Sequence, residues 1–213
     1  MRPLLGVQVP FLDETVIDER AALWRRKFAP GTPCDQEVDM TEVVEAIDGF
    51  EIGRYKVRFG VDVLPSNVLG ATTFDVSTST IHMDFSNETY ALMDRDGRAR
   101  FTPAHEIGHI KLHLDKLIEL TKLPHIEVAL ARASQTHSDS CDSEVQANRF
   151  AAAFLAPDDG LKVLDRDGAL DIDTVMKVFG MSRSAALWRI HNYRRAVALR
   201  DRRDYNTRRR GGR

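Results

Sequence analysis

The sequence predicts an α+β fold in which helices pack on a small mixed or antiparallel sheet. Three patterns along the chain support this prediction. Apolar side chains recur at helical spacing in residues 15–28 and 40–47, alternate with polar ones between residues 50 and 85, and return to helical spacing beyond residue 101. Strands that are grouped in one part of the chain are typical of α+β proteins. The length of 213 residues suffices for one sizeable core, or for one domain with a small appendage.

Two helices are expected before the strands. The first spans Thr15–Phe28, and its apolar face is formed by Ile17, Ala21, Trp24 and Phe28. The second follows Asp39-x-x-Glu42, which resembles a capping box, and is stopped by Gly49. Its apolar face consists of Met40, Val43, Val44 and Ile47. We expect both helices to serve as scaffold.

The strand region contains a predicted hairpin. Residues 50–59 alternate with a slip near Gly53, which predicts a β-bulge, and residues 61–64 continue this strand. Residues 70–76 and 80–85 bracket a likely turn sequence, Ser77-Thr78-Ser79, and predict two strands of a hairpin. In the second of these strands one face is expected to carry Ile81, Met83 and Phe85, and the other His82 and Asp84.

Residues 101–113, which read FTPAHEIGHIKLH, contain an H-E-x-x-H motif from His105 to His109. Residues four apart lie on the same face of a helix, so both imidazoles can reach one metal ion. Thr102 is a suitable N-cap and Pro103 suits the first helical position, so the helix is predicted to begin there. The charged residues 94–100 are then a turn that leads into it.

The motif is typical of zinc peptidases, in which its glutamate is the general base. Glu106 projects from the strip of the helix beside the two histidines, where it can contact a water on the ion. The alternative is an amphipathic helix whose histidines are ordinary surface or core residues. Manganese and iron also accept two histidines and a carboxylate, so zinc is the first of three candidate ions.

A third protein ligand is needed, and Glu144 is the best candidate. His113 lies ~12 Å along the helix axis from His105, too far for one ion to contact both, and is expected to be a second-shell or packing residue. Glu144 begins a predicted helix whose apolar stripe contains small alanines, which would permit a close approach to the His105 helix. Its alternative role is a first-turn acid that favours the helix dipole. Asp142 and Asp139 are further candidates.

These two stretches resemble the ImmA/IrrE metallopeptidases, whose pattern runs approximately R-F-T-x-A-H-E-x-G-H-x-x-x-H and then E-x-x-A-N-x-F-A-x-x-x-L-x-P. Here the second block reads EVQANRFAAAFLAP from Glu144. The resemblance implies a zincin-like domain with His105, His109 and Glu144 as zinc ligands and Glu106 as the catalytic base. Pro103 departs from the family, which usually has an aliphatic residue there.

Substrate contacts are expected at a sheet edge, because zinc peptidases commonly bind a substrate as an added strand beside the active-site helix. The strand at residues 80–85 is the candidate edge, with Ile81, His82 and Met83 as tentative contact residues. Residues 121–143 are expected to form a polar loop over the cleft. Within that loop, His125 or His137 is a candidate for oxyanion stabilisation.

The end of the chain resembles a helix-turn-helix. A predicted helix at 171–179, a turn at Gly180-Met181-Ser182 and a predicted helix from Arg183 have the appropriate spacing. Ten arginines and two aspartates from Arg189 onward give this end a net charge of +8, which leaves −10 on the rest of the chain, since the total is −2. The basic end either contacts nucleic acid or is a solvated tail. The helical pair either binds DNA or caps the catalytic domain by packing.

The predicted organisation is a zincin-like domain at 1–160, a helix-turn-helix-like segment at 161–199 and an Arg-rich tail at 200–213. Two separated cysteines, Cys34 and Cys141, predict a reducing cytoplasm, and the absence of a long apolar run predicts no membrane contact. We therefore expect a zinc endopeptidase, and resemblance implies that it cleaves a helix-turn-helix repressor of a mobile element or stress regulon. The alternative is a DNA-binding regulator or toxin–antitoxin partner.

Overall fold

The computed structural model describes residues 8–65, 67–121 and 139–211, and it confirms the α+β fold. The helices are α1 (Glu14–Phe28), α2 (Met40–Ile47), α3 (Asn87–Leu92), α4 (Gly97–Thr121), α5 (Ser143–Leu155), α6 (Asp158–Arg166), α7 (Ile172–Phe179) and α8 (Arg183–Gly211). The strands are β1 (Glu51–Ile52), β2 (Tyr55–Asp62), β3 (Gly70–Asp75) and β4 (Thr80–Ser86), and a short 3-10 helix, η1, spans Asp139–Cys141.

The four strands form one mixed sheet in the order β1-β2-β4-β3. β1 pairs with β2 and β3 pairs with β4, both antiparallel, whereas β2 and β4 are parallel neighbours. The predicted bulge near Gly53 is wrong: Gly53 has a φ of +60° and forms the tight turn between β1 and β2. The predicted hairpin of β3 and β4 is confirmed. In β4 the alternation is also confirmed, since Ile81, Met83 and Phe85 are fully buried.

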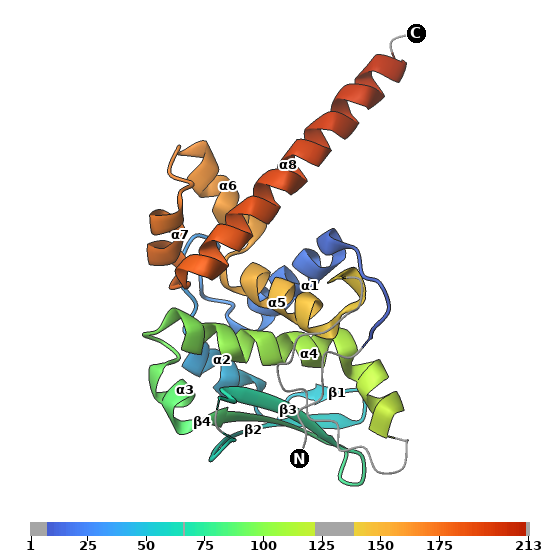
Figure 1. The fold of residues 1–213 in the computed structure, drawn as a ribbon, viewed down its shortest axis with the longest axis vertical. Coiled ribbons are helices and arrows are strands. Elements are labelled where there is room, and N and C mark those ends of the chain that lie inside the picture. Colours follow the sequence, from blue (N-terminus) through green and yellow to red (C-terminus); the bar gives the residue numbers. More distant parts are fainter. Residues whose placement is uncertain (1–7, 66, 122–138, 212–213) are drawn as a thin grey trace.

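The elements are arranged in layers around α4 (Figure 1). The sheet lies on one side of α4, and α5 and α1 lie on the other. α6, α7 and the first half of α8 are placed beyond α5, and the rest of α8 leads away from the body. The helix that carries the H-E-x-x-H motif is therefore the central helix of the molecule, covered on both sides.

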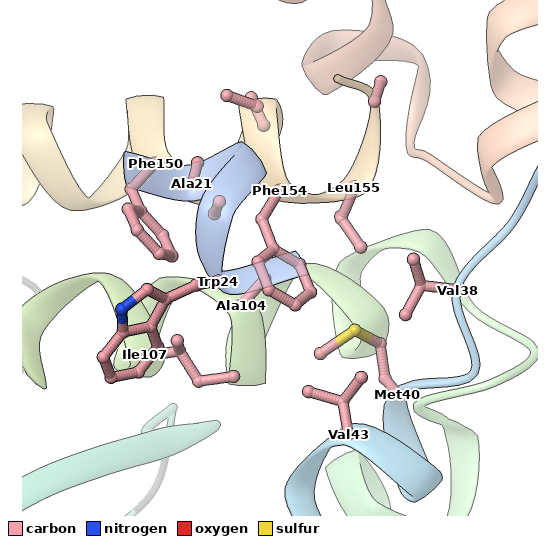
Figure 2. Close-up of a cluster of buried hydrophobic side chains, with 14 of the residues drawn as sticks. Ala21, Trp24, Val38, Met40, Val43, Ala104, Ile107, Phe150, Phe154 and Leu155 are labelled. Carbon is pink, nitrogen blue, oxygen red and sulfur yellow. The ribbon is translucent and has the colours of Figure 1, made fainter. Parts of the chain in front are cut away.

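One hydrophobic cluster joins these layers (Figure 2). Phe150 and Phe154 extend from α5 toward α4, where Ala104 and Ile107 meet them, and Trp24 of α1 lies beside them. All of these side chains are buried, so most of their apolar surface is removed from water, at roughly 25 cal/mol per Å². The apolar faces predicted for α1 and α2 also lie in this cluster.

The start of α4 differs from the prediction, because the helix begins at Gly97 and Pro103 lies inside it. Asp96 acts as the cap, and its carboxylate accepts hydrogen bonds of 2.9 Å from the backbone N–H groups of Arg98 and Ala99. Gly97 packs on the next layer, since a Cβ there would lie 2.4 Å from the backbone nitrogen of Ser182. A sequence-local cap and a distant contact thus outweigh the single hydrogen bond that the proline removes.

The C-terminal helices share the main core. Val175, Phe179 and Ile190 belong to the same buried cluster as the α4 and α5 side chains. The predicted division at 160/161 falls inside α6, and the division at 199/200 falls inside α8, so neither position is a break in secondary structure. The Arg-rich end is helical up to Gly211. Among the described residues, none of the helices combines the length and apolar character that crossing a membrane requires.

Arginines of α8 attach this helix to acidic residues of the body. Arg189, which is buried, lies 2.7 Å from an Asp158 oxygen, and Arg200 lies 3.2 Å from the other. Arg195 pairs with Glu14 at the start of α1. The opposite charges of the body and the basic end therefore have a structural consequence, because ion pairs between them hold α8 in place.

Substitution of Asp158 tests how much these ion pairs stabilise the fold. Burial raises the pKa of its carboxyl, but the charges of Arg189 and Arg200 and the hydrogen bonds they donate outweigh it and hold the pKa below the usual 3.8. Its stabilising effect is complete above pH 3.8 and is lost as the pH falls through the lower folded-state pKa. We expect Asp158→Asn to lower the free energy of unfolding by about 2 kcal/mol at pH 7, measured by urea titration, and by much less near pH 3.

Asp159→Asn is the matched control. Asp159 occupies the same first turn of α6 and shares its helix-dipole position, but 70% of its side chain is exposed. We expect this control to change stability by less than about 0.5 kcal/mol at either pH. Equal destabilisation by Asp158→Asn at pH 7 and pH 3 would contradict the ion-pair explanation.

Candidate metal centre

Side chains from two helices meet at a buried point between α4 and α5. The Nε2 atoms of His105 and His109 are 2.9 Å apart, and they lie 3.2 Å from the Oε2 and Oε1 atoms of Glu144, respectively. The ligand atoms of these three residues all lie within 4.8 Å of one another, so the group could hold one metal ion. The structure thus brings together the three residues that the sequence suggested as ligands.

The close approach of α4 and α5 makes this meeting possible. Gly108 lies between the two histidines in sequence, and a Cβ there would lie 3.2 Å from the backbone of Ala147 and from Phe150. Ala147 is fully buried on the α5 side of the contact. The small alanines of α5 have the predicted effect, but they need a partner on α4, and that partner is the glycine inside the motif.

Each histidine is oriented by a hydrogen bond at its other ring nitrogen. The Nδ1 of His105 lies 3.0 Å from the Oδ1 of Asn148, and the Nδ1 of His109 lies 3.2 Å from the Nδ1 of His113. Because an amide oxygen only accepts, His105 carries its proton on Nδ1 and turns the lone pair of Nε2 toward Glu144. This is the usual arrangement of metal-binding histidines.

The donor set fits a cation. Glu144 Oε1 is buried and has no hydrogen bond with acceptable geometry, although His109 Nε2 lies at ion-pair distance. An imidazole lone pair and a carboxylate are both acceptors, and converging acceptors repel unless a proton or a metal ion lies among them. Two imidazole nitrogens and a carboxylate oxygen are ligands that zinc, manganese or iron accepts.

The pKa shifts agree with a centre that attracts a cation. Burial raises the pKa of Glu144, but the close approach of the His105 and His109 rings outweighs this effect and holds the pKa of this carboxyl far below its usual range. Burial lowers the pKa of His109, but the Glu144 carboxylate outweighs this effect and leaves the pKa above its ordinary value. A proton on His109 and a bound metal ion would therefore compete for the same group of side chains. Metal binding must displace that proton, so we expect affinity to fall as the pH falls.

Glu106 lies outside the ligand group and is held by a residue that sequence reasoning missed. The hydroxyl of Thr72 on β3 donates a 2.8 Å hydrogen bond to the Oε2 of Glu106, and both side chains are buried. The bond joins the sheet to α4 and restricts the carboxylate to one orientation. The sequence contains no local signal for it, because Thr72 is an ordinary strand residue 34 positions before Glu106.

The prediction that residues 80–85 form the edge of the sheet is wrong. β4, which carries Ile81, His82 and Met83, lies between β2 and β3, so its backbone groups are already paired on both sides. The edge beside α4 is β3 instead, as the bond from Thr72 shows. Strand order results from pairing between distant segments, which the alternation pattern does not encode.

The remaining predicted candidates have other roles or positions. Asp142 is the N-cap of α5 and accepts hydrogen bonds from the backbone N–H groups of Glu144 and Val145. His113 is buried, and its Nδ1 lies against the Nδ1 of His109, as expected for a residue that supports a ligand without contacting the ion; burial together with the charge of His109 lowers the pKa of His113 to about 3. His125 and His137 lie outside the described residues, and so does most of the predicted loop that contains them.

A buried site of two histidines and a glutamate, with a second glutamate on the motif helix, is the arrangement found in metallopeptidases. Residues 91–191 match the family of IrrE N-terminal-like domains, Peptidase_M78. The predicted resemblance to the ImmA/IrrE metallopeptidases is thereby confirmed over these residues. The match contains both motifs, α7 and the beginning of α8, but not the sheet.

One solved structure that resembles the chain is a Mycobacterium tuberculosis transcriptional regulator, with 17% identity and a TM-score of 0.44. The similarity covers 82% of the present chain and 59% of that protein, so the chain spans less than two thirds of its length. No curated protein matches the sequence.

Removal of the carboxylate ligand tests the centre. We expect Glu144→Gln to lower zinc affinity by more than about 100-fold, because a neutral amide replaces the anionic ligand, whereas loss of an outer partner alone costs roughly 10- to 100-fold. Affinity is measured by competition with a coloured chelator at pH 7.5. Glu119→Gln is the control, since Glu119 is 67% exposed on the same helix as the histidines. Equal affinities for the two variants would exclude Glu144 as a ligand.

Proposed function

We propose that this protein is a zinc-dependent metalloendopeptidase whose ligands are His105, His109 and Glu144 and whose general base is Glu106. The observation that carries the proposal is the buried convergence of three acceptors beside a separately held carboxylate. Manganese or iron would fit the same ligands, and a metal analysis distinguishes them.

A bound zinc ion would polarise the scissile carbonyl and lower the pKa of a water molecule to about 7. The residues of the chain supply the remaining requirements. Glu106 would act as the general base, with one carboxylate oxygen to accept a proton from the attacking water and to return it to the leaving amine. Thr72 keeps the Oε2 of Glu106 hydrogen-bonded, which leaves Oε1 as the oxygen that receives the proton. Burial of Glu106 and His109 excludes bulk water from this step.

An extended peptide would pair with β3, an edge strand of the sheet among the described residues. In the described part of the chain, the outer side of β3 has no neighbouring strand, and an added strand would lie alongside α4, near Thr72 and Glu106. Family resemblance suggests that the peptide belongs to a helix-turn-helix transcriptional repressor of a mobile element or a stress regulon. Cys34 and Cys141 are both free thiols, which favours a cytoplasmic location.

Replacement of the general base separates catalysis from metal binding. We expect Glu106→Gln to retain zinc and fold but to reduce peptide cleavage by roughly 10²- to 10⁴-fold, because the amide cannot accept the water's proton. A helix-turn-helix repressor encoded beside the gene is co-expressed with wild type or with the variant, and the products are read by mass spectrometry. One discrete cut that appears only with wild type is the expected result.

Metal content is measured on the same samples, so that an empty centre is not mistaken for an inactive one. A cut of equal yield with Glu106→Gln would exclude Glu106 as the base. An intact repressor with zinc-loaded wild type would instead exclude this repressor as the substrate.

A second candidate function is DNA binding through the basic end of α8. The observation that favours it is a continuous helix that extends beyond the body, with Arg202 exposed and further arginines up to residue 210. Against it, the turn between α7 and α8 is packed on α4: a Cβ at Gly180 would lie 2.6 Å from the guanidinium of Arg100. The arginines at 189, 195 and 200 are also engaged with the body.

Truncation after Arg200 removes the projecting end and keeps the ion pairs that attach α8. If the second function holds, the full chain should bind duplex DNA with an affinity that falls steeply with salt, and the truncated chain should lose most of that binding. Electrophoretic mobility shifts between 50 and 200 mM salt, roughly the range over which phosphate contacts weaken, provide the measurement. Equal weak binding by both chains would leave α8 with a structural role.

A further inference from the structure

We propose that His113 and Gln146 are positioning residues that determine which nitrogen of His109 faces the metal. They form a hydrogen-bond chain with a fixed direction, which begins at the backbone carbonyls of Pro10 and Ser140 and ends at the Nε2 of His109. The inference rests on the proposed metal centre but not on peptidase activity. It assigns a functional role to a buried histidine and glutamine and to the N-terminal segment.

The side-chain amide of Gln146 fixes the direction of the chain. Its Nε2 lies 3.0 Å from the carbonyl oxygen of Pro10 and 2.9 Å from that of Ser140. Carbonyl oxygens only accept hydrogen bonds, so both amide protons are used by these two bonds. The reversed amide would place its oxygen against two other oxygens. The Oε1 of Gln146 must therefore be the atom that faces His113.

The next bond determines the tautomer of His113. Its Nε2 lies 3.1 Å from the Oε1 of Gln146, which is an acceptor, so His113 carries its proton on Nε2. The Nδ1 of the neutral ring is then a bare lone pair. This lone pair lies 3.2 Å from the Nδ1 of His109.

The last bond orients the metal ligand. Because the Nδ1 of His113 accepts, the Nδ1 of His109 must donate. A neutral His109 therefore has its lone pair on Nε2, the atom that lies near His105 and Glu144. With the opposite tautomer, His109 would present an N–H group to the ion and could not bind it. These hydrogen bonds thus favour the metal-binding tautomer of His109 even when no metal ion is bound.

Burial enforces the direction of these hydrogen bonds. His109, His113 and Gln146 are at most 2% exposed, so water is not available to replace a lost partner. An unpaired buried donor or acceptor costs about 1–3 kcal/mol, which disfavours the alternative tautomers.

The N-terminal segment is part of this arrangement. The backbone N–H of Val9 donates a 2.9 Å hydrogen bond to the carbonyl of Cys141, and Gln8 forms an antiparallel bridge with Asp142. Pro10 and Ser140, whose carbonyls hold Gln146, therefore belong to two segments that are tied to each other. Their relative position sets the amide of Gln146 and, through it, the ring of His109.

Histidine tautomers are measured directly by NMR on the full-length, ¹⁵N-histidine-labelled protein, both metal-free and zinc-loaded. Long-range ¹H–¹⁵N correlations distinguish a protonated from a bare ring nitrogen. We expect His113 to be neutral with its proton on Nε2 in both states, and the Nδ1 of His109 to be protonated in both. A His113 that is protonated on Nδ1, or that is an imidazolium at pH 7.5, would overturn the proposal.

Gln146→Met tests the consequence for metal binding. Methionine fills a similar volume but provides neither the amide protons nor the oxygen, so the tautomer of His113 is no longer fixed. We expect a mixture of His113 tautomers and a roughly 10- to 100-fold loss of zinc affinity, the usual cost of an outer partner. His113→Phe should give a similar loss. His191→Phe is its control, because His191 is an exposed histidine on α8.

The outcomes separate this inference from the proposed function. Tight zinc binding without any peptide cleavage would remove the peptidase proposal and leave the hydrogen-bond chain intact. Unchanged zinc affinity in both Gln146→Met and His113→Phe would overturn the positioning role. If either variant fails to fold, as judged by circular dichroism, the wild-type tautomers still decide the direction of the chain.

Discussion

The contact between Gly108 and Ala147 is the constraint on which the site depends. A Cβ at Gly108 would meet the α5 backbone at 3.2 Å, closer than almost all Cβ contacts in proteins, so glycine favours the close approach of the two helices. The approach places Glu144 beside His105 and His109, and it also places Phe150 and Phe154 against the apolar side of α4. The same contact therefore helps to build both the metal centre and the hydrophobic core.

Around this contact the protein buries hydrogen-bonded polar groups, and in each hydrogen bond the donor and the acceptor are fixed. Asn148 accepts from His105, Thr72 donates to Glu106, and Gln146 connects His113 to two backbone carbonyls. In a medium of low dielectric such bonds specify one arrangement, because every alternative leaves a donor or acceptor unpaired. The three ligand atoms are the exception, since they are acceptors that face one another. That exception distinguishes a centre that needs a cation from a hydrogen-bonded core.

The C-terminal helices resemble a DNA-binding motif in sequence, but their packing gives them a structural role. Gly97 and Gly180 bring the α7–α8 turn onto the start of α4, and Arg100 fills the space between them. Helix α8 is attached further along by Arg189, whose guanidinium also donates to the carbonyl of Ala156 at the end of α5. The start of α4 and the end of α5 thus both lie against the helix-turn-helix-like pair, which links the position of this pair to the geometry of the site.

The sequence by itself determined the features that depend on local spacing. These are the two histidines on one helix face, the capping of α2 by Asp39, the apolar stripes, the β3–β4 hairpin and, through a motif of fixed pattern, Glu144. Only the tertiary structure decided the strand order that makes β3 the edge, the start of α4 at Gly97, and the roles of Thr72 and Gln146. Each of these depends on contacts between residues far apart in the chain. Helical periodicity and capping encode the conformation of a segment, whereas which segments meet is fixed by packing and by the pairing of buried polar groups.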